Sequence, residues 1–175
     1  MVAIHLILPT EGNLDQVWDY RRECLDAGSS MDGCGPMRQS DTLAKWLATV
    51  ISYTDPATLP EGKVLATQFL AVRKSDGRLV GMIQVRHYFN EYLEKYAGHI
   101  GYSVRPCERR KGYAKEMLRL ALPYCKGIGL TNVLVSCEVD NEGSRRTILS
   151  NGGVYESTVH EPEENIDLER YWITL

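Results

Sequence analysis

The segment 102–115 reads Tyr-Ser-Val-Arg-Pro-Cys-Glu-Arg-Arg-Lys-Gly-Tyr-Ala-Lys and decides the fold. An extended stretch stops at Pro106, three basic residues follow, and an amphipathic helix begins beside Gly112. The first turn of a helix has unpaired N–H groups and a partial positive charge, so it favours anions. Gly112 lets a ligand approach the backbone closely because it has no side chain. The segment therefore predicts a phosphate or pyrophosphate site, and a solvated basic turn is the plainer alternative.

The stretch after the basic residues carries the period of a helix. From Lys111 onward, apolar residues recur at spacings of three and four, at Ala114, Met117, Leu118, Ala121, Leu122 and Cys125. Pro123 has no backbone N–H, so we expect a bend or an early end of the helix there. Upstream of the basic residues, 99–104 is typical of a strand.

The rest of the chain alternates between strand and helix patterns. We expect strands over residues 4–8, 64–72, 79–85, 133–139, 154–159 and 167–174. We expect helices over 14–25, 40–51 and 141–150, a loop over 28–36 and a short helical insert over 89–96. The order is β-α-α-β-β-β-α-β-α-β-β, an α/β protein with a mixed sheet. No repeat or long linker divides it, so residues 1–175 are expected to form a single domain.

Composition excludes several classes of protein. The 175 residues are 43% hydrophobic and 25% charged, with a net charge of -3, which argues against general nucleic-acid binding. No apolar run is long enough to span a membrane, and the start does not resemble a signal peptide. Five scattered cysteines without a C-x-x-C pair predict no metal site and no disulfide framework, as in a reducing cytoplasm. Cys34 and Cys107 have no histidine nearby in sequence, so no acyl-cysteine is expected.

The basic segment is also specific enough to resemble a family. Residues 109–114, Arg-Arg-Lys-Gly-Tyr-Ala, resemble the Q/R-x-x-G-x-G/A pyrophosphate loop of the GCN5-related N-acetyltransferase (GNAT) superfamily. Residues 100–106 resemble the family's fourth strand, and residues 140–144 and 151–153 resemble its next conserved block. The order of elements matches as well. Within the superfamily the chain is most similar to a group of uncharacterised bacterial acetyltransferases.

The resemblance implies a mixed, mostly antiparallel sheet whose fourth and fifth strands splay apart, and it implies acetyl-CoA as acetyl donor. By analogy, Arg109 and the N–H groups of residues 110–114 hold the pyrophosphate, and the backbone of Tyr102 and Val104 pairs with the pantetheine arm. Asn141 either contacts the pantetheine or caps the helix that follows it, and one side chain could do both. The implied cofactor-binding set is Tyr102, Ser103, Val104, Arg109, Arg110, Lys111, Gly112, Tyr113, Ala114, Lys115, Asn141 and Ser144.

The family chemistry is direct attack of an amine on the acetyl thioester, which needs a neutral amine and a proton for the leaving thiolate. Many members carry a tyrosine seven residues after the asparagine, and Ile148 occupies that position here. Tyr155 and Tyr171 are candidate substitutes. For a general base we name His99 first and Glu138 second, and each has a plainer role, as a structural histidine or a solvated carboxylate.

The acceptor amine is expected between the loop 31–37, the segment 86–88 and the last strands. The acidic residues Glu161, Glu163, Glu164 and Asp167 either attract a cationic amine or form a solvated loop. A small primary amine is favoured as acceptor over a protein amine. A silent acyl-CoA-binding module is the alternative, and a nucleotide-binding module ranks last. The resemblance also allows a homodimer.

Overall fold

The structure is a computed structural model that describes residues 2–175. Its strands are β1 (Ile4–Ile7), β2 (Ala66–Arg73), β3 (Leu79–Arg86), β4 (Ile100–Val104), β5 (Asn132–Glu138), β6 (Val154–Glu161) and β7 (Ile166–Thr174). Its α-helices are α1 (Leu14–Asp26), α2 (Leu43–Ser52), α3 (Tyr113–Gly127) and α4 (Glu142–Leu149). Short helical turns at Glu11–Asn13, Leu93–Ala97 and Pro106–Glu108 complete the described elements. The order predicted from the sequence is confirmed.

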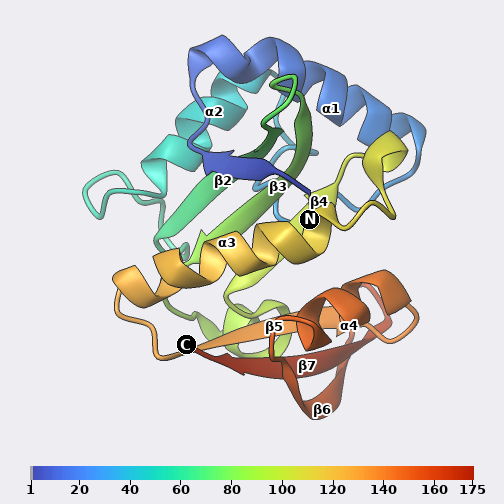
Figure 1. Cartoon of the computed structure of the whole chain (residues 1–175). Coiled ribbons are helices and arrows are strands. Elements are labelled where there is room, and N and C mark those ends of the chain that lie inside the picture. The colour runs from blue at the N-terminus through green and yellow to red at the C-terminus, as the bar shows by residue number, and fades with distance from the viewer. Residues whose placement is uncertain (1) are drawn as a thin grey trace.

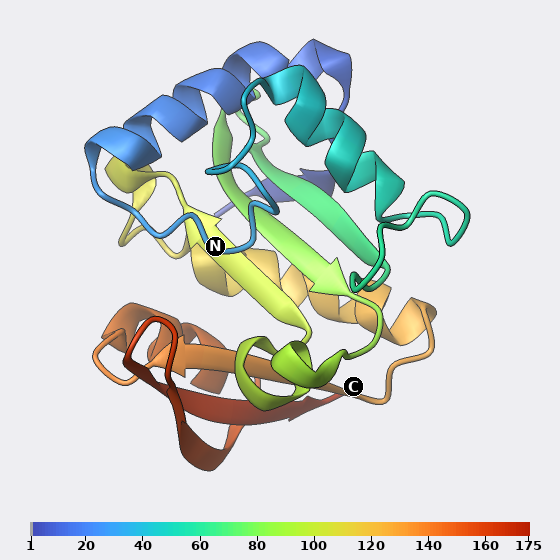
Figure 2. The ribbon, with the colours of Figure 1, turned by 180° about the vertical axis from the view of Figure 1, so that it is seen from behind.

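The strands form two antiparallel sheets, in the orders β1-β2-β3-β4 and β5-β7-β6 (Figure 1). α3 crosses one face of the first sheet, while α1 and α2 cover its other face (Figures 1 and 2). Two apolar cores follow from this layering. One lies under α3 and extends into the second sheet, and the other lies under α1 and α2 around the buried Trp46. The sheet is therefore enclosed, and β4 lies at its edge beside β5.

The two sheets meet at one end of β4. The backbone N–H of His99 donates to the carbonyl of Leu134 at 2.8 Å, and the N–H of Leu134 donates back to the His99 Nδ1 at 2.9 Å. Gly98 forms an isolated bridge with Val135 next to these bonds. Within residues 2–175 no further ladder joins β4 to β5, so the two strands diverge beyond this junction. The predicted splay is confirmed.

Of the bend or early end expected at Pro123, the early end is wrong, and several element ends shift by one or two residues. α3 does not end at Pro123 but continues to Gly127. Pro123 lies on the exposed side, whereas Ala121 and Cys125 on either side of it are fully buried. Their burial outweighs the single backbone hydrogen bond that proline cannot form. The insert expected over 89–96 is a helical turn at Leu93–Ala97.

Gly98 is expected to be the least replaceable glycine of the junction. Its φ is +68°, and an added Cβ would lie 2.4 Å from the carbonyl oxygen of Leu134. We expect Gly98→Ala to lower the free energy of unfolding by about 2 kcal/mol or more, because it adds a backbone clash to an unfavourable φ. Urea denaturation measures this. Gly129→Ala is the matched control, since Gly129 has a φ of +93° but open space around it. Equal losses for the two variants would contradict a special role for the junction.

Candidate functional site

The loop before α3 presents backbone donors to solvent. Gly112 is the N-cap of α3, with a φ of +87° and no atom within 4 Å of where a Cβ would stand. Arg110 also has a positive φ, of 62°. Among the residues that the structure describes, the backbone N–H groups of residues 110–112 donate no hydrogen bond. Unpaired N–H groups at the start of a long helix make a site for an anion such as a pyrophosphate.

The basic side chains of this loop are mostly engaged in holding it. Arg109 donates to the carbonyl of Val104 at 3.1 Å and to the Ser29 hydroxyl at 2.8 Å. Lys111 lies 2.8 Å from the carboxylate of Glu108. Among residues 2–175 only the exposed Arg110 of the three has no protein partner. The predicted positive charge is therefore present, but the backbone supplies most of the free donors.

Three other predicted residues, Tyr113, Ala114 and Lys115, form the first turn of α3. Tyr113 is 5% exposed, and its hydroxyl accepts a hydrogen bond from Arg73 at 3.1 Å. Ala114 is half-buried and Lys115 is exposed. Sequence patterns place all three in the first turn, but only the fold shows that the ring of Tyr113 belongs to the core.

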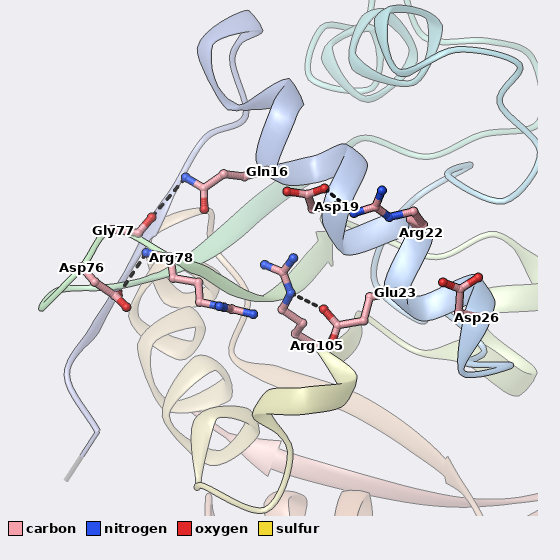
Figure 3. A pocket seen from close by; sticks show the side chains of 9 residues that line it. All are labelled: Gln16, Asp19, Arg22, Glu23, Asp26, Asp76, Gly77, Arg78 and Arg105. Atoms are coloured by element: carbon pink, nitrogen blue, oxygen red, sulfur yellow. Dashed lines mark hydrogen bonds and ion pairs between the residues drawn. The ribbon is translucent and has the colours of Figure 1, made fainter.

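Two carboxylates, the half-buried Glu23 and the buried Glu108, anchor the loop, and the sequence did not single them out. Glu23 on α1 binds the guanidinium of Arg105 at 2.6 Å and the backbone N–H of Cys107 at 2.9 Å (Figure 3). Burial raises the pKa of Glu23, but the hydrogen bonds from Cys107 and Arg105 outweigh it and lower the pKa to about 2. Glu108 is 5% exposed and pairs with three cations, Arg73, Arg78 and Lys111. The groove of about 640 Å³ drawn in Figure 3 is lined by such paired charges.

The free edge of β4 continues from this loop. Arg86 N–H bonds to the carbonyl of His99, and Arg105 N–H bonds to the carbonyl of Val80, both at 2.8 Å. Hydrogen-bonded and non-hydrogen-bonded pairs alternate along an antiparallel ladder, so the peptide groups of Tyr102 and Val104 point away from β3. They therefore face the gap toward β5, which supports the prediction that they pair with an extended ligand.

Side chains on the two faces of β4 have different surroundings. Ser103 points toward α1, where its hydroxyl lies 2.8 Å from the Tyr20 hydroxyl and 3.2 Å from the Cys34 sulfur. Tyr102 points the other way and its hydroxyl lies 2.7 Å from the Ser144 hydroxyl, across the gap. Asn141 accepts the N–H of Ser144 at 3.1 Å and so caps α4. The cap role of Asn141 is thus present, and its side-chain N–H₂ group remains available for a ligand.

A cavity of about 750 Å³ opens beside the ends of β2 and β3, between the connection that follows α1 and the segment 90–93. The connection between α1 and α2 crosses in front of the sheet there (Figure 2). It comes so close that a Cβ on Gly33 would lie 2.1 Å from the carbonyl oxygen of Gly101. Gln68 and Trp46 hold it in place by donating to the carbonyls of Gly33 and Cys34, each at 2.7 Å. Of the predicted acceptor segments, the loop 31–37 and Arg86 of the segment 86–88 meet at this cavity, whereas residues 87–88 and the last strands do not line it.

The comparison with known families follows the same residues. The model of the acetyltransferase (GNAT) domain family matches residues 8–154, which include the loop, β4 and α4. This chain is a GNAT-family protein. No curated protein was similar enough in sequence to count as a match.

Solved GNAT structures share the fold at low sequence identity. Ribosomal-protein-S5-alanine acetyltransferase from Vibrio fischeri is 16% identical, with a TM-score of 0.74 over 98% of this chain and 92% of that one. A spermidine N-acetyltransferase chimera that includes the Vibrio cholerae enzyme is 16% identical, with a TM-score of 0.67 over 98% and 94%. yncA from Salmonella typhimurium, with its cofactor acetyl-CoA, is 14% identical, with a TM-score of 0.63 over 99% and 94%. Such complexes support acetyl-CoA as the acetyl donor in this GNAT fold.

The position at which many GNAT proteins carry a tyrosine is buried in this chain. Ile148 is fully buried in the core under α3. Tyr171 is 3% exposed and donates to Glu169 at 2.7 Å, while Tyr155 is exposed and bonded to Thr158. Neither hydroxyl is free, so the structure offers no direct replacement among these residues.

The helices of residues 2–175 are all too short or too polar to span a bilayer.

His99 is fixed in the junction between the two sheets. It is 5% exposed, its Nδ1 accepts the Leu134 N–H, and its ring lies 4.0 Å from the ring of Phe89, centroid to centroid. Burial, and then the charge of Arg86, lowers the pKa of the imidazole to about 4. A base this weak is poorly matched to an amine proton at neutral pH. Its catalytic role remains a prediction, and these features weigh against it.

Glu138 remains a predicted base. It ends β5, and because Val133, Val135 and Cys137 pack in the core with α3, Glu138 lies on the opposite face of the strand. Burial, and then the charges of Asp140, Asp32 and Glu164, raises the pKa of its carboxyl. Ser136 shares this face, and its buried hydroxyl has no hydrogen-bond partner among the described residues. Sequence reasoning missed Ser136, because serine in a strand carries no distinctive pattern.

The acidic hairpin between β6 and β7 divides into structural and free groups. Glu161 is 1% exposed and accepts the backbone N–H groups of Glu163 and Glu164 at 3.2 and 2.7 Å. Asp167 pairs with His160 at 2.8 Å. Only Glu163 and Glu164 are left to act on an acceptor, and that role remains a prediction.

Burial raises the pKa of the Cys34 thiol to about 12, in line with the expectation that Cys34 forms no acyl-cysteine.

The neutral state of His99 gives a test of its structural role. The folded pKa of about 4 lies below the ordinary value of 6.5, so the unfolded chain binds the extra proton as pH falls between these values. We expect wild type to lose about 3 kcal/mol more unfolding free energy than His99→Asn between pH 6.5 and 4. Asparagine keeps an acceptor for Leu134 but does not titrate. Urea denaturation across this range measures the difference, and parallel pH curves would remove the assignment.

Proposed function

We propose that the protein is an N-acetyltransferase that moves an acetyl group from acetyl-CoA to a primary amine, with a small molecule as acceptor. The observation that carries this proposal is that the parts of the site form one continuous path. The open donors at Gly112 lead into the free edge of β4, and that edge ends beside the cavity under Gly33. Similarity to solved GNAT structures over 98% of the chain supports one acetyltransferase unit across residues 1–175.

Each part of this path has a chemical role. Acetyl-CoA, when bound, supplies an acetyl thioester. The N–H groups of residues 110–114 and the side chain of Arg110 bind the pyrophosphate, and the peptide groups of Tyr102 and Val104 bind the pantetheine arm. The Asn141 amide reaches the same gap from α4. The splayed strands thus position the thioester at the cavity, where its reaction with an amine becomes effectively unimolecular.

The nitrogen of the neutral attacking amine must lose a proton as it becomes an amide. We assign this step to Glu138, whose raised pKa suits a general base and which lies on the face of β5 opposite α3. The new N–C bond forms as the C–S bond breaks, the sulfur departs as a thiolate, and the amine proton passes to Glu138. The buried Ser136 hydroxyl lies on the same face and can donate to an oxygen or a water there.

The cofactor site is tested by isothermal titration with acetyl-CoA. We expect wild type to bind and Gly112→Asp to lose at least about tenfold in affinity, because a carboxylate would stand where the pyrophosphate binds. Gly129→Asp is the matched control, since Gly129 also has a positive φ and open surroundings. Binding by Gly112→Asp with unchanged affinity would contradict the assignment.

The base is tested by the pH dependence of turnover. We expect Glu138→Gln to lower kcat/KM by about 100-fold and to remove the acidic limb of the profile. Asp140→Asn removes one of the charges that raise the Glu138 pKa, so it should shift that limb to lower pH while turnover at high pH is kept. An unchanged profile in Glu138→Gln would exclude the role.

A second candidate function rests on Ile148. A GNAT fold that buries an isoleucine where relatives carry a tyrosine could bind acyl-CoA without catalysing transfer. Release of free CoA separates the two. An enzyme releases CoA in proportion to added amine, whereas a binding module shows a titration isotherm and no release.

A further inference from the structure

The acceptor cavity contains an arginine without a counter-ion. Arg86 ends β3 and lines the cavity together with Asp32, Gln84 and Lys63. Its guanidinium lies against β4, because a Cβ on Gly101 would stand 3.2 Å from Nη2. Arg86 is therefore placed where the cavity reaches the strand that carries the proposed thioester site.

The hydrogen bonds of Arg86 leave most of its donors unused. Nη1 donates to the carbonyls of Ala97 and Gly98 at 3.3 and 3.4 Å, both long contacts. Within residues 2–175, Nε and Nη2 have no acceptor and no carboxylate forms an ion pair with this side chain. Burial lowers the pKa of the guanidinium, although the charge of Asp32 acts in the opposite direction.

Most other arginines of low exposure in the described chain have a carboxylate partner. Arg73, Arg105, Arg145 and Arg170 each have one at 2.6 to 3.0 Å, whereas the half-buried Arg21 on α1 donates only to the carbonyl of Ser40. Removing a charge from water is costly unless an opposite charge meets it. The free fork of Arg86 has the geometry that binds a carboxylate through two parallel hydrogen bonds.

Negatively charged side chains lie toward the gap between β4 and β5. Asp32 is exposed, bonds only to the Ser30 hydroxyl at 2.8 Å and has no cation partner among residues 2–175. Asp32 lines the cavity, and its charge and that of Glu164 raise the pKa of Glu138. Cationic groups are attracted there, whereas anions are attracted to Arg86.

Building on the proposed function, we infer that the acceptor is a small amine that also carries a carboxylate close to its amino group, as an α-amino acid does. Arg86 binds the carboxylate. The amino end lies toward Asp32 and Glu138. Its neutral form attacks the thioester, and Glu138 takes the proton that the nitrogen loses as the amide forms. A polyamine would leave Arg86 without a partner, and a peptide N-terminus would present a neutral amide to it.

Matched pairs of acceptors test this inference. Free CoA is measured with saturating acetyl-CoA and a panel of α-amino acids, each compared with its own primary amide. For the best acceptor, we expect wild type to favour the acid over the amide in kcat/KM by about 30-fold, the effect of a charge-assisted hydrogen bond. Arg86→Gln should bring the ratio close to one, and Arg86→Lys, which keeps the charge but not the fork, should fall between them.

Two controls make the result specific. Arg22→Gln removes an exposed arginine on α1, outside the acceptor cavity, and should keep the wild-type ratio. Lys63 is a second cation of the cavity, so loss of the preference in Lys63→Gln but not in Arg86→Gln would overturn the assignment to Arg86. A wild-type ratio of one or less overturns the inference and leaves the acetyltransferase proposal intact.

A binding measurement covers the case in which no amine releases CoA. That result counts against the proposed catalysis, and thermal denaturation with the same panel then decides the inference. An acid that raises the Tm of wild type but not of Arg86→Gln, with the amide inactive on both, supports the carboxylate site. No rise in wild type with any acid overturns it. Circular dichroism of each variant checks that its fold is retained.

Discussion

The site depends on the junction that joins the two sheets at Gly98 and His99. Two hydrogen bonds between His99 and Leu134 bring the start of β4 against β5, and the positive φ of Gly98 lets the backbones approach. Beyond this point the strands separate, so β4 keeps a free edge without becoming an exposed edge of the whole molecule. A free edge offers unpaired peptide groups, which an extended ligand can use as a partner strand would.

The loop at the other end of β4 is held in shape by charges that do not face the ligand. Glu23 and Glu108 neutralise arginines and lysine from three segments of the chain, and Arg109 ties the loop back to Val104. The backbone donors near Gly112 are then oriented before any ligand arrives, which lowers the ordering cost of binding. The basic cluster thus serves the site mainly through its effect on the backbone.

In the proposed function, the two faces of β4 separate the cofactor side from the acceptor side. Tyr102 reaches Ser144 on α4, whereas Gly101 and Ser103 meet the connection between α1 and α2. That connection, Arg86 at the end of β3 and the segment 90–93 line a cavity of mixed charge. An anion partner for Arg86 near a group of carboxylates suits an acceptor with both charges better than a purely cationic one.

The sequence by itself determined the order of elements, the loop at residues 109–112 and the glycine that opens it, because these follow from local periodicity, capping and turn chemistry. The tertiary structure alone decided the rest. It turned His99 into a junction residue, buried Tyr113 and Ile148, and carried α3 past Pro123, since burial of neighbouring apolar side chains outweighed a local preference. It also left Arg86 without a carboxylate and Ser136 without a partner. Whether a side chain has a hydrogen-bond or charge partner depends on segments far away in the sequence, and a local sequence pattern does not show which distant segments come close.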